Sequence, residues 1–210
     1  MDPLLAILGI LAAIAVGAIS PGPSFVLVAR IAVARSRAEG LAAAVGMGMG
    51  GVMLCGLALL GLHALLALAG WLSVALRLAG GLYLLYLAVL IWRGAAEPVG
   101  IARAVTPDMG GLGRSFALAL ATQISNPKAI AVYASIFAAL LPPEVPGWVL
   151  VVLPLGLFIV EAGWYAIVAL AFSAPRPRDA YLRSKLWVDR LAAAVMGVLG
   201  LRLLGEAARA

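Results

Sequence analysis

The sequence predicts an all-α polytopic membrane protein with six transmembrane helices, arranged as two inverted three-helix repeats. Three observations lead to this fold class. Of the 210 residues, 65% are hydrophobic and only 11% are charged, the mean hydropathy is +1.12, and the apolar residues fall in long segments. Soluble domains carry about 25% charged residues, so this chain has too few to cover a water-facing surface. Membrane barrels would show short alternating strands instead.

Six segments approach the length of about 20 apolar residues that a membrane-spanning helix needs. They are residues 3–29, 41–62, 71–92, 115–141, 147–173 and 188–205. The sixth is the weakest, because Asp189, Arg190 and Arg202 leave only residues 191–201 without charge. The chain opens Met1-Asp2-Pro3 without the basic start of a secretory signal, so the first segment is expected to be retained.

Basic residues lie on the odd-numbered loops and their edges. Loops two (63–70) and four (142–146) have none. Because cytoplasmic loops hold the excess of Lys and Arg, the odd loops are expected in the cytoplasm and both termini outside. The net charge of +6 is explained by the basic residues of these cytoplasmic loops, so no nucleic-acid partner is expected. The basic residues concerned are Arg30, Arg35, Arg37, Arg93, Arg103, Arg114, Arg176, Arg178, Arg183, Lys185 and Arg190.

The two halves of the chain resemble each other. Residues 19–32 read ISPGPSFVLVARIA and residues 124–137 read ISNPKAIAVYASIF. Because each half has three spans, the second must run opposite to the first, which is a common plan of secondary transporters. A single membrane domain is therefore expected, with repeat one at about 1–93, a linker at about 94–114 and repeat two at about 115–210.

Prolines interrupt the first span of each half near the middle of the membrane. Proline removes a backbone donor, and unpaired backbone groups in hydrocarbon cost several kcal/mol. Each break should therefore face protein or a watery cavity. The restarting helices, at Pro23-Ser24 and Lys128-Ala129, would point free N–H groups and positive dipole ends inward. Together they would suit an anion such as a carboxylate. A plain proline kink packed by neighbouring helices is the alternative.

The candidate substrate-binding residues follow from these breaks. They are Ser20, Pro21, Gly22, Pro23 and Ser24 in the first, and Gln123, Ser125, Asn126, Pro127 and Lys128 in the second. The polar side chains could equally satisfy broken backbone. Lys128 could neutralise a substrate carboxylate, cap free carbonyls, or pair with an acid, and a charge at that depth is costly without such a partner.

Glu161 is the carboxylate well inside a span. It could couple transport to protons or hold a substrate ammonium, and the alternative is a fixed ion pair with Lys128. The run GMGMGG at 46–51 lacks the preceding strand of a nucleotide loop, so it is expected to serve close helix packing. With one His and one Cys, no metal site or cofactor is expected, and no set of catalytic residues indicates an enzyme.

The chain resembles the LysE/RhtB family of bacterial amino-acid exporters. The resemblance is carried by SPGP at 20–23 with the arginine-bearing loop after it, RLAGGLYLLYLAVLIWRG at 77–94, and NPKAI at 126–130. The chain departs from the family at Ser24 and in AIAVY at 129–133, where bulkier residues often follow NPK. The resemblance implies export of amino acids or close derivatives from the bacterial cytoplasmic membrane, by proton antiport.

Three other functions are compatible with a helical membrane protein. An inorganic ion permease should show several inward carboxylates or thiols, and an intramembrane enzyme acting on lipid needs a nucleophile and base at membrane depth. A structural subunit has no reason to break two spans in register. Small-residue helix faces serve packing within or between chains, so a homo-oligomer stays open.

Overall fold

The computed structural model describes residues 2–68, 70–97, 110–142 and 145–209. Within these ranges the chain forms eight α-helices and no strand. In each half, two short helices are followed by two long ones. The helices are α1 (Pro3–Ile19), α2 (Pro23–Ala34), α3 (Arg37–Leu68), α4 (Gly70–Gly94), α5 (Leu112–Ser125), α6 (Pro127–Leu140), α7 (Val149–Phe172) and α8 (Pro175–Ala207).

Both predicted breaks are present where the prolines place them. Helix α1 ends at Ser20, which has an extended backbone, and Pro23 opens α2. The two helices are bent by 58° at this point. In the second half α5 ends at Asn126 and Pro127 opens α6. Proline suits the first position of a helix because the N–H group that it lacks would have no partner there.

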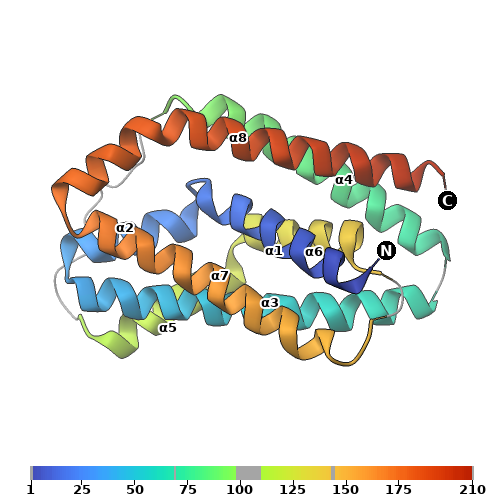
Figure 1. Ribbon diagram of the computed structural model, residues 1–210, viewed down its shortest axis with the longest axis horizontal. Coiled ribbons are helices and arrows are strands. Elements are labelled where there is room, and N and C mark those ends of the chain that lie inside the picture. The colour runs from blue at the N-terminus through green and yellow to red at the C-terminus, as the bar shows by residue number, and fades with distance from the viewer. Residues whose placement is uncertain (1, 69, 98–109, 143–144, 210) are drawn as a thin grey trace.

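The helices form an elongated bundle (Figure 1). The most extensive contacts join α4 to α8, α3 to α7 and α3 to α5. Between the α4–α8 pair and the α3–α7 pair lie α1 and α6, so the breaks fall in the middle of the molecule (Figure 1). Helix α1 begins and α8 ends at the same end of the bundle, and the connections α2–α3 and α7–α8 lie at the opposite end (Figure 1).

Several helices are longer than the predicted apolar segments. Helix α3 runs from Arg37 to Leu68 rather than over 41–62, and α8 starts at Pro175 rather than at 188. Local pairing contributes at the predicted start of the α8 segment. Lys185 and Asp189, one turn apart, form a salt bridge of 2.8 Å, which stabilises the helix across the boundary that hydropathy predicts at residue 188. Of the predicted linker at 94–114, residues 98–109 lie outside the described part.

Part of the bundle has the length and composition to cross a bilayer. The segments Arg37–Gly61 and Val149–Phe172 do so as single helices, and α1 with α2 does so as one bent span. Large apolar side chains cover the outside of the bundle, as a lipid-facing surface requires. Among them are Leu57, Leu60, Val151, Trp187 and Val198, each more than 60% exposed. The other three expected spans stay predictions.

The glycine run of α3 packs closely, as predicted. A Cβ added at Gly46 would collide with the carbonyl oxygen of Phe116 on α5. One added at Gly50 would lie 2.6 Å from the Cβ of Gln123, also on α5. Only glycine therefore lets these two helices approach so closely, and this approach carries Gln123 into the centre of the bundle.

Candidate functional site

The two breaks are in direct contact. The amide Nδ2 of Asn126, in the second break, donates to Ser24 Oγ at the start of α2 (2.9 Å). Lys128 Nζ donates to the backbone carbonyl of Ser20 (3.1 Å), and its side chain lies against Gly22. Residues more than 100 positions apart in sequence thus form one polar centre, while the bundle around it is apolar.

A chain of hydrogen bonds leads from the first break to Glu161 on α7. Ser24 Oγ donates to Gln123 Oε1 (2.6 Å), and Gln123 Nε2 donates to Glu161 Oε2 (2.8 Å). The hydroxyl of Tyr133, on α6, donates to the other carboxylate oxygen, Oε1 (3.0 Å). Ser24, Gln123 and Glu161 are all 2–3% exposed. Each oxygen of the buried carboxylate therefore has a neutral donor.

Helix α3 makes room for this carboxylate. A Cβ added at Gly51 would lie 2.6 Å from Glu161 Oε2 and 2.7 Å from the hydroxyl of Tyr133. Contacts this short do not occur between real side chains, so any larger residue at position 51 would displace the acid or the tyrosine. The glycine run therefore serves the site as well as the helix packing.

A small cavity of about 30 Å³ lies at the meeting point of the breaks. A water molecule needs roughly 10–15 Å³ by this measure, so the space holds about two waters and no solute of amino-acid size. Binding such a solute requires the helices to move apart. The polar residues lining it are Ser20, Ser24, Gln123, Asn126, Lys128, Tyr133, Glu161 and Tyr165, and Gly22 closes one side.

Not every predicted site residue reaches this cavity. Ser125 is exposed and donates instead to the carbonyl of Ala121 on its own helix (2.6 Å). The prolines Pro21, Pro23 and Pro127 shape the breaks without lining the cavity. In the described part of the chain, no salt bridge joins Lys128 to Glu161. The interpretation of these two as a fixed ion pair is therefore wrong, because neutral donors hold the acid and a backbone carbonyl holds the lysine.

Sequence reasoning missed Tyr133 and Tyr165. Tyr165 follows Glu161 by four residues, and Tyr133 follows Asn126 by seven. Both spacings place side chains on one helical face, which was a usable signal. Among the described residues, no group of three or more His, Cys, Asp or Glu side chains gathers into a candidate metal site.

The bundle and its polar centre define an α-helical membrane protein built around two broken helices. The sequence model of the LysE type translocator matches residues 15–207. The chain therefore belongs to the LysE type translocator family.

Curated relatives agree with this assignment. The threonine efflux protein of Escherichia coli (strain K12) is 34% identical over 194 residues, which are 90% of this chain and 92% of that protein. The uncharacterized membrane protein YahN of the same strain is 29% identical, covering 98% of this chain and 92% of its own length. The leucine efflux protein of Salmonella choleraesuis (strain SC-B67) is 33% identical over 60% of this chain and 58% of its own. No solved structure matches.

Proposed function

We propose that the protein is a secondary exporter of amino acids or close derivatives in the bacterial cytoplasmic membrane, driven by proton antiport. Two kinds of observation support this. The relatives include threonine and leucine efflux proteins. The two helix breaks meet around a buried carboxylate and a lysine, and the contact between the breaks is the observation that carries the proposal.

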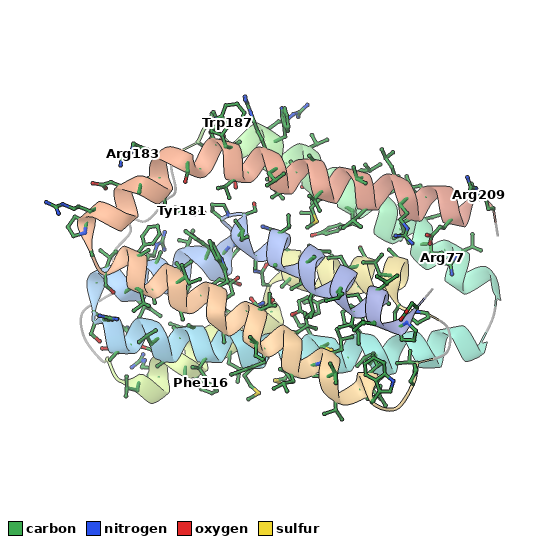
Figure 2. All side chains as sticks on the ribbon, viewed as in Figure 1. Arg77, Phe116, Tyr181, Arg183, Trp187 and Arg209 are labelled. Carbon is green, nitrogen blue, oxygen red and sulfur yellow. The ribbon has the colours of Figure 1, made fainter. Side chains whose placement is uncertain are left out.

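The proposed architecture is six spans in two inverted repeats. The order of two short helices and two long ones occurs in both halves, and each long helix packs on its counterpart, α3 on α7 and α4 on α8. The connections α2–α3 and α7–α8, with the basic residues around them, lie at one end of the bundle, and the start of α1 and the end of α8 lie at the other (Figure 1). Arg183 lies toward the first of these ends and Arg209 toward the second (Figure 2). The positive-inside rule then favours odd loops in the cytoplasm.

The substrate carboxylate is proposed to bind at the first break. Gly22, in the capping position before α2, offers no side-chain cap, so the amides of Ser24 and Phe25 remain available at the positive end of the helix. Lys128 brings a positive charge to the same place, since its side chain touches Gly22. The second break contributes Asn126 and Gln123 through Ser24.

Glu161 is proposed to carry the coupling proton. It is 2% exposed, and the hydrogen-bond chain through Gln123 connects it to the first break. The titratable groups that face it are Tyr133 on α6 and Tyr165 on its own helix. A protonated Glu161 would no longer accept hydrogen bonds on both oxygens from Gln123 and Tyr133. Because Gln123 also bonds to Ser24, protonation of Glu161 can alter the first break, where the substrate is proposed to bind. Rocking of one repeat against the other would expose the site to each side in turn.

Inverted membrane vesicles test the proposal. Radiolabelled amino acids should accumulate in vesicles that contain the protein when the lumen is acidified, and should stop accumulating when the pH gradient is dissipated. Glu161→Gln should remove the dependence on the gradient while leaving counterflow exchange of substrate. No gradient-dependent accumulation across the proteinogenic amino acids would refute the exporter. Unchanged coupled flux in Glu161→Gln would refute the role of the acid.

A further inference from the structure

The carbonyl end of α1 is occupied by side chains from the second half of the molecule. The last carbonyls of a helix have no partner within it and form its negative end. Lys128 Nζ donates to the carbonyl of Ser20 (3.1 Å), and the hydroxyl of Tyr181 donates to that of Ile19 (3.2 Å). In Figure 2, Tyr181 lies on the inner side of α8 whereas Trp187 points away from the bundle. A primary ammonium group, that of Lys128, therefore already binds here.

Asp189, on α8, is a buried acid with one oxygen unused. Its residue is 3% exposed, and its Oδ2 accepts a hydrogen bond from Lys185 Nζ (2.8 Å). Its Oδ1 is buried and has no hydrogen-bond partner. Lys185 divides its donors between Asp189 and the carbonyls of Gly94 (2.9 Å) and Ala95 (3.0 Å) at the end of α4. Because buried polar atoms nearly always have partners, an unpaired carboxylate oxygen calls for an explanation.

The position of Asp189 relates it to the carbonyl end of α1. Helix α8 packs against both α1 and α6. Tyr181, on the same helix two turns before Asp189, donates to the carbonyl of Ile19 at the end of α1. Within the described part of the chain no salt bridge joins Asp189 to Lys128, since the lysine turns to Ser20 instead. The charge of Asp189 therefore lies on the helix that reaches the carbonyl end of α1, and it is not paired with the lysine that is now bound there.

We propose that the carbonyl end of α1 and Asp189 form a primary-ammonium site, filled by Lys128 in the unloaded protein and by the α-ammonium of an amino acid during transport. This inference rests on the proposed function and names the second half of its substrate site. The substrate ammonium releases Lys128 from Ser20, and the freed lysine pairs with the substrate carboxylate at the start of α2.

The first break suits a zwitterion for a simple reason. Its negative carbonyl end and its positive amide end are separated by three residues, Ser20 to Gly22, so opposite charges on neighbouring atoms of one solute can each find a partner. Glu161 is not needed for the ammonium, because both of its oxygens already accept hydrogen bonds. Asp189 has the oxygen that is free.

The test compares three probes that differ by one charged group. L-threonine has both groups, 3-hydroxybutyrate lacks the ammonium, and 1-amino-2-propanol lacks the carboxylate. Binding to purified protein is measured for the wild type and for Asp189→Asn, which keeps the side-chain shape and an acceptor for Lys185. Asp189→Asn should lower the affinity for L-threonine and for 1-amino-2-propanol at least about tenfold, because both place a cation beside the lost charge. The affinity for 3-hydroxybutyrate, which has no cation, should fall less than about twofold.

Matched variants separate this role from others. Glu206→Gln removes a carboxylate from the same helix, at the exposed pair with Arg202, and should leave all three affinities unchanged. Equal weakening of all three probes by Asp189→Asn, or no weakening of any, overturns the ammonium site while the exporter stands. The proposal also fails if Glu161→Gln, and not Asp189→Asn, selectively weakens binding of the two probes that carry an ammonium group. That result would place the substrate ammonium at Glu161.

A measurement on the wild type covers the case in which Asp189→Asn does not fold. In the wild type, 1-amino-2-propanol should compete with L-threonine for binding, and the absence of competition overturns the inference. If the wild type carries no amino acid at all, the proposed function fails and this inference fails with it.

Discussion

The two helix breaks share a sequence pattern but differ in how their backbone groups are satisfied. The second break is a single residue, Asn126, which ends α5 and begins α6. Its side-chain oxygen accepts a hydrogen bond from the N–H of Lys128 (3.0 Å). The first break has three residues, and its helix start at Gly22 has no side-chain cap. One break is therefore closed by its own side chain, and the other is left open.

The partners of the two breaks differ in the same way. The first break depends on side chains from the second half, with Lys128 on Ser20 and Tyr181 on Ile19. The second break contacts the first half through Ser24, which accepts a hydrogen bond from Asn126 (2.9 Å), and through the hydroxyl of Tyr83, which lies 3.4 Å from the carbonyl of Pro127. Groups held by distant side chains can be released without unfolding a helix. We infer that the first break is the part that exchanges partners during transport and the second is a fixed support.

The largest effect is expected from Lys128→Met, which removes the ammonium group that donates to the carbonyl of Ser20 in the first break. Lys128 is proposed to pair with the substrate carboxylate, and truncating one partner of a buried charge pair costs about 2–5 kcal/mol. Transport should therefore fall by at least about 30-fold. The thermal midpoint should not fall, because a lysine at membrane depth is itself costly, by about 2.5–3.5 kcal/mol. Flux in reconstituted vesicles and thermal unfolding in detergent measure the two quantities. Lys128→Arg keeps the charge and should retain part of the flux; a Met variant within twofold of wild type would contradict the role.

The breaks themselves could be predicted from sequence because their signal is local. Proline fixes its own backbone angle and removes its own donor, so SPGP and NPK mark the interruptions wherever the helices pack. The contact between the breaks was predicted from the proposed repeat, and the hydrogen bond from Asn126 to Ser24 shows it. For Lys128 the sequence leaves three partners open: a substrate carboxylate, a free carbonyl at the break, or an acid. The structure shows the carbonyl of Ser20, and the sequence could not make this choice because it depends on how the helices pack.

Asp189 shows the same limit. In the sequence it weakens the sixth apolar segment, whereas in the fold it pairs with Lys185 one turn earlier and becomes part of the interior. The spacing of four residues predicts the pair. It does not say which face of α8 turns inward, since that depends on how α8 packs against α1, α4 and α6.

A smaller effect is expected from Gly22→Asn, which gives the first break the cap that the second one has. Gly22 has an extended backbone that any residue can adopt. An added Cβ lies 3.3 Å from the flexible end of Lys128, which can shift. The substrate must then displace a cap worth a few tenths of a kcal/mol more than glycine, so affinity for L-threonine should fall about twofold while the thermal midpoint rises slightly. Gly113→Asn, where an added Cβ meets nothing within 4 Å, is the control, and unchanged affinity in Gly22→Asn would show that these amides do not bind substrate.

The smallest effect is expected from Tyr83→Phe, which removes the weaker of two contacts between the first half and the second break. At 3.4 Å the bond from the Tyr83 hydroxyl to the Pro127 carbonyl is near the limit for a hydrogen bond, and its loss should cost less than about 0.5 kcal/mol. The Asn126 cap and the bond from Asn126 to Ser24 remain, so flux should stay within about twofold of wild type. A loss of transport as large as that of Lys128→Met would mean that the second break also depends on the opposite half. The two breaks would then be mechanically equivalent, and the first would no longer be the only part that exchanges partners.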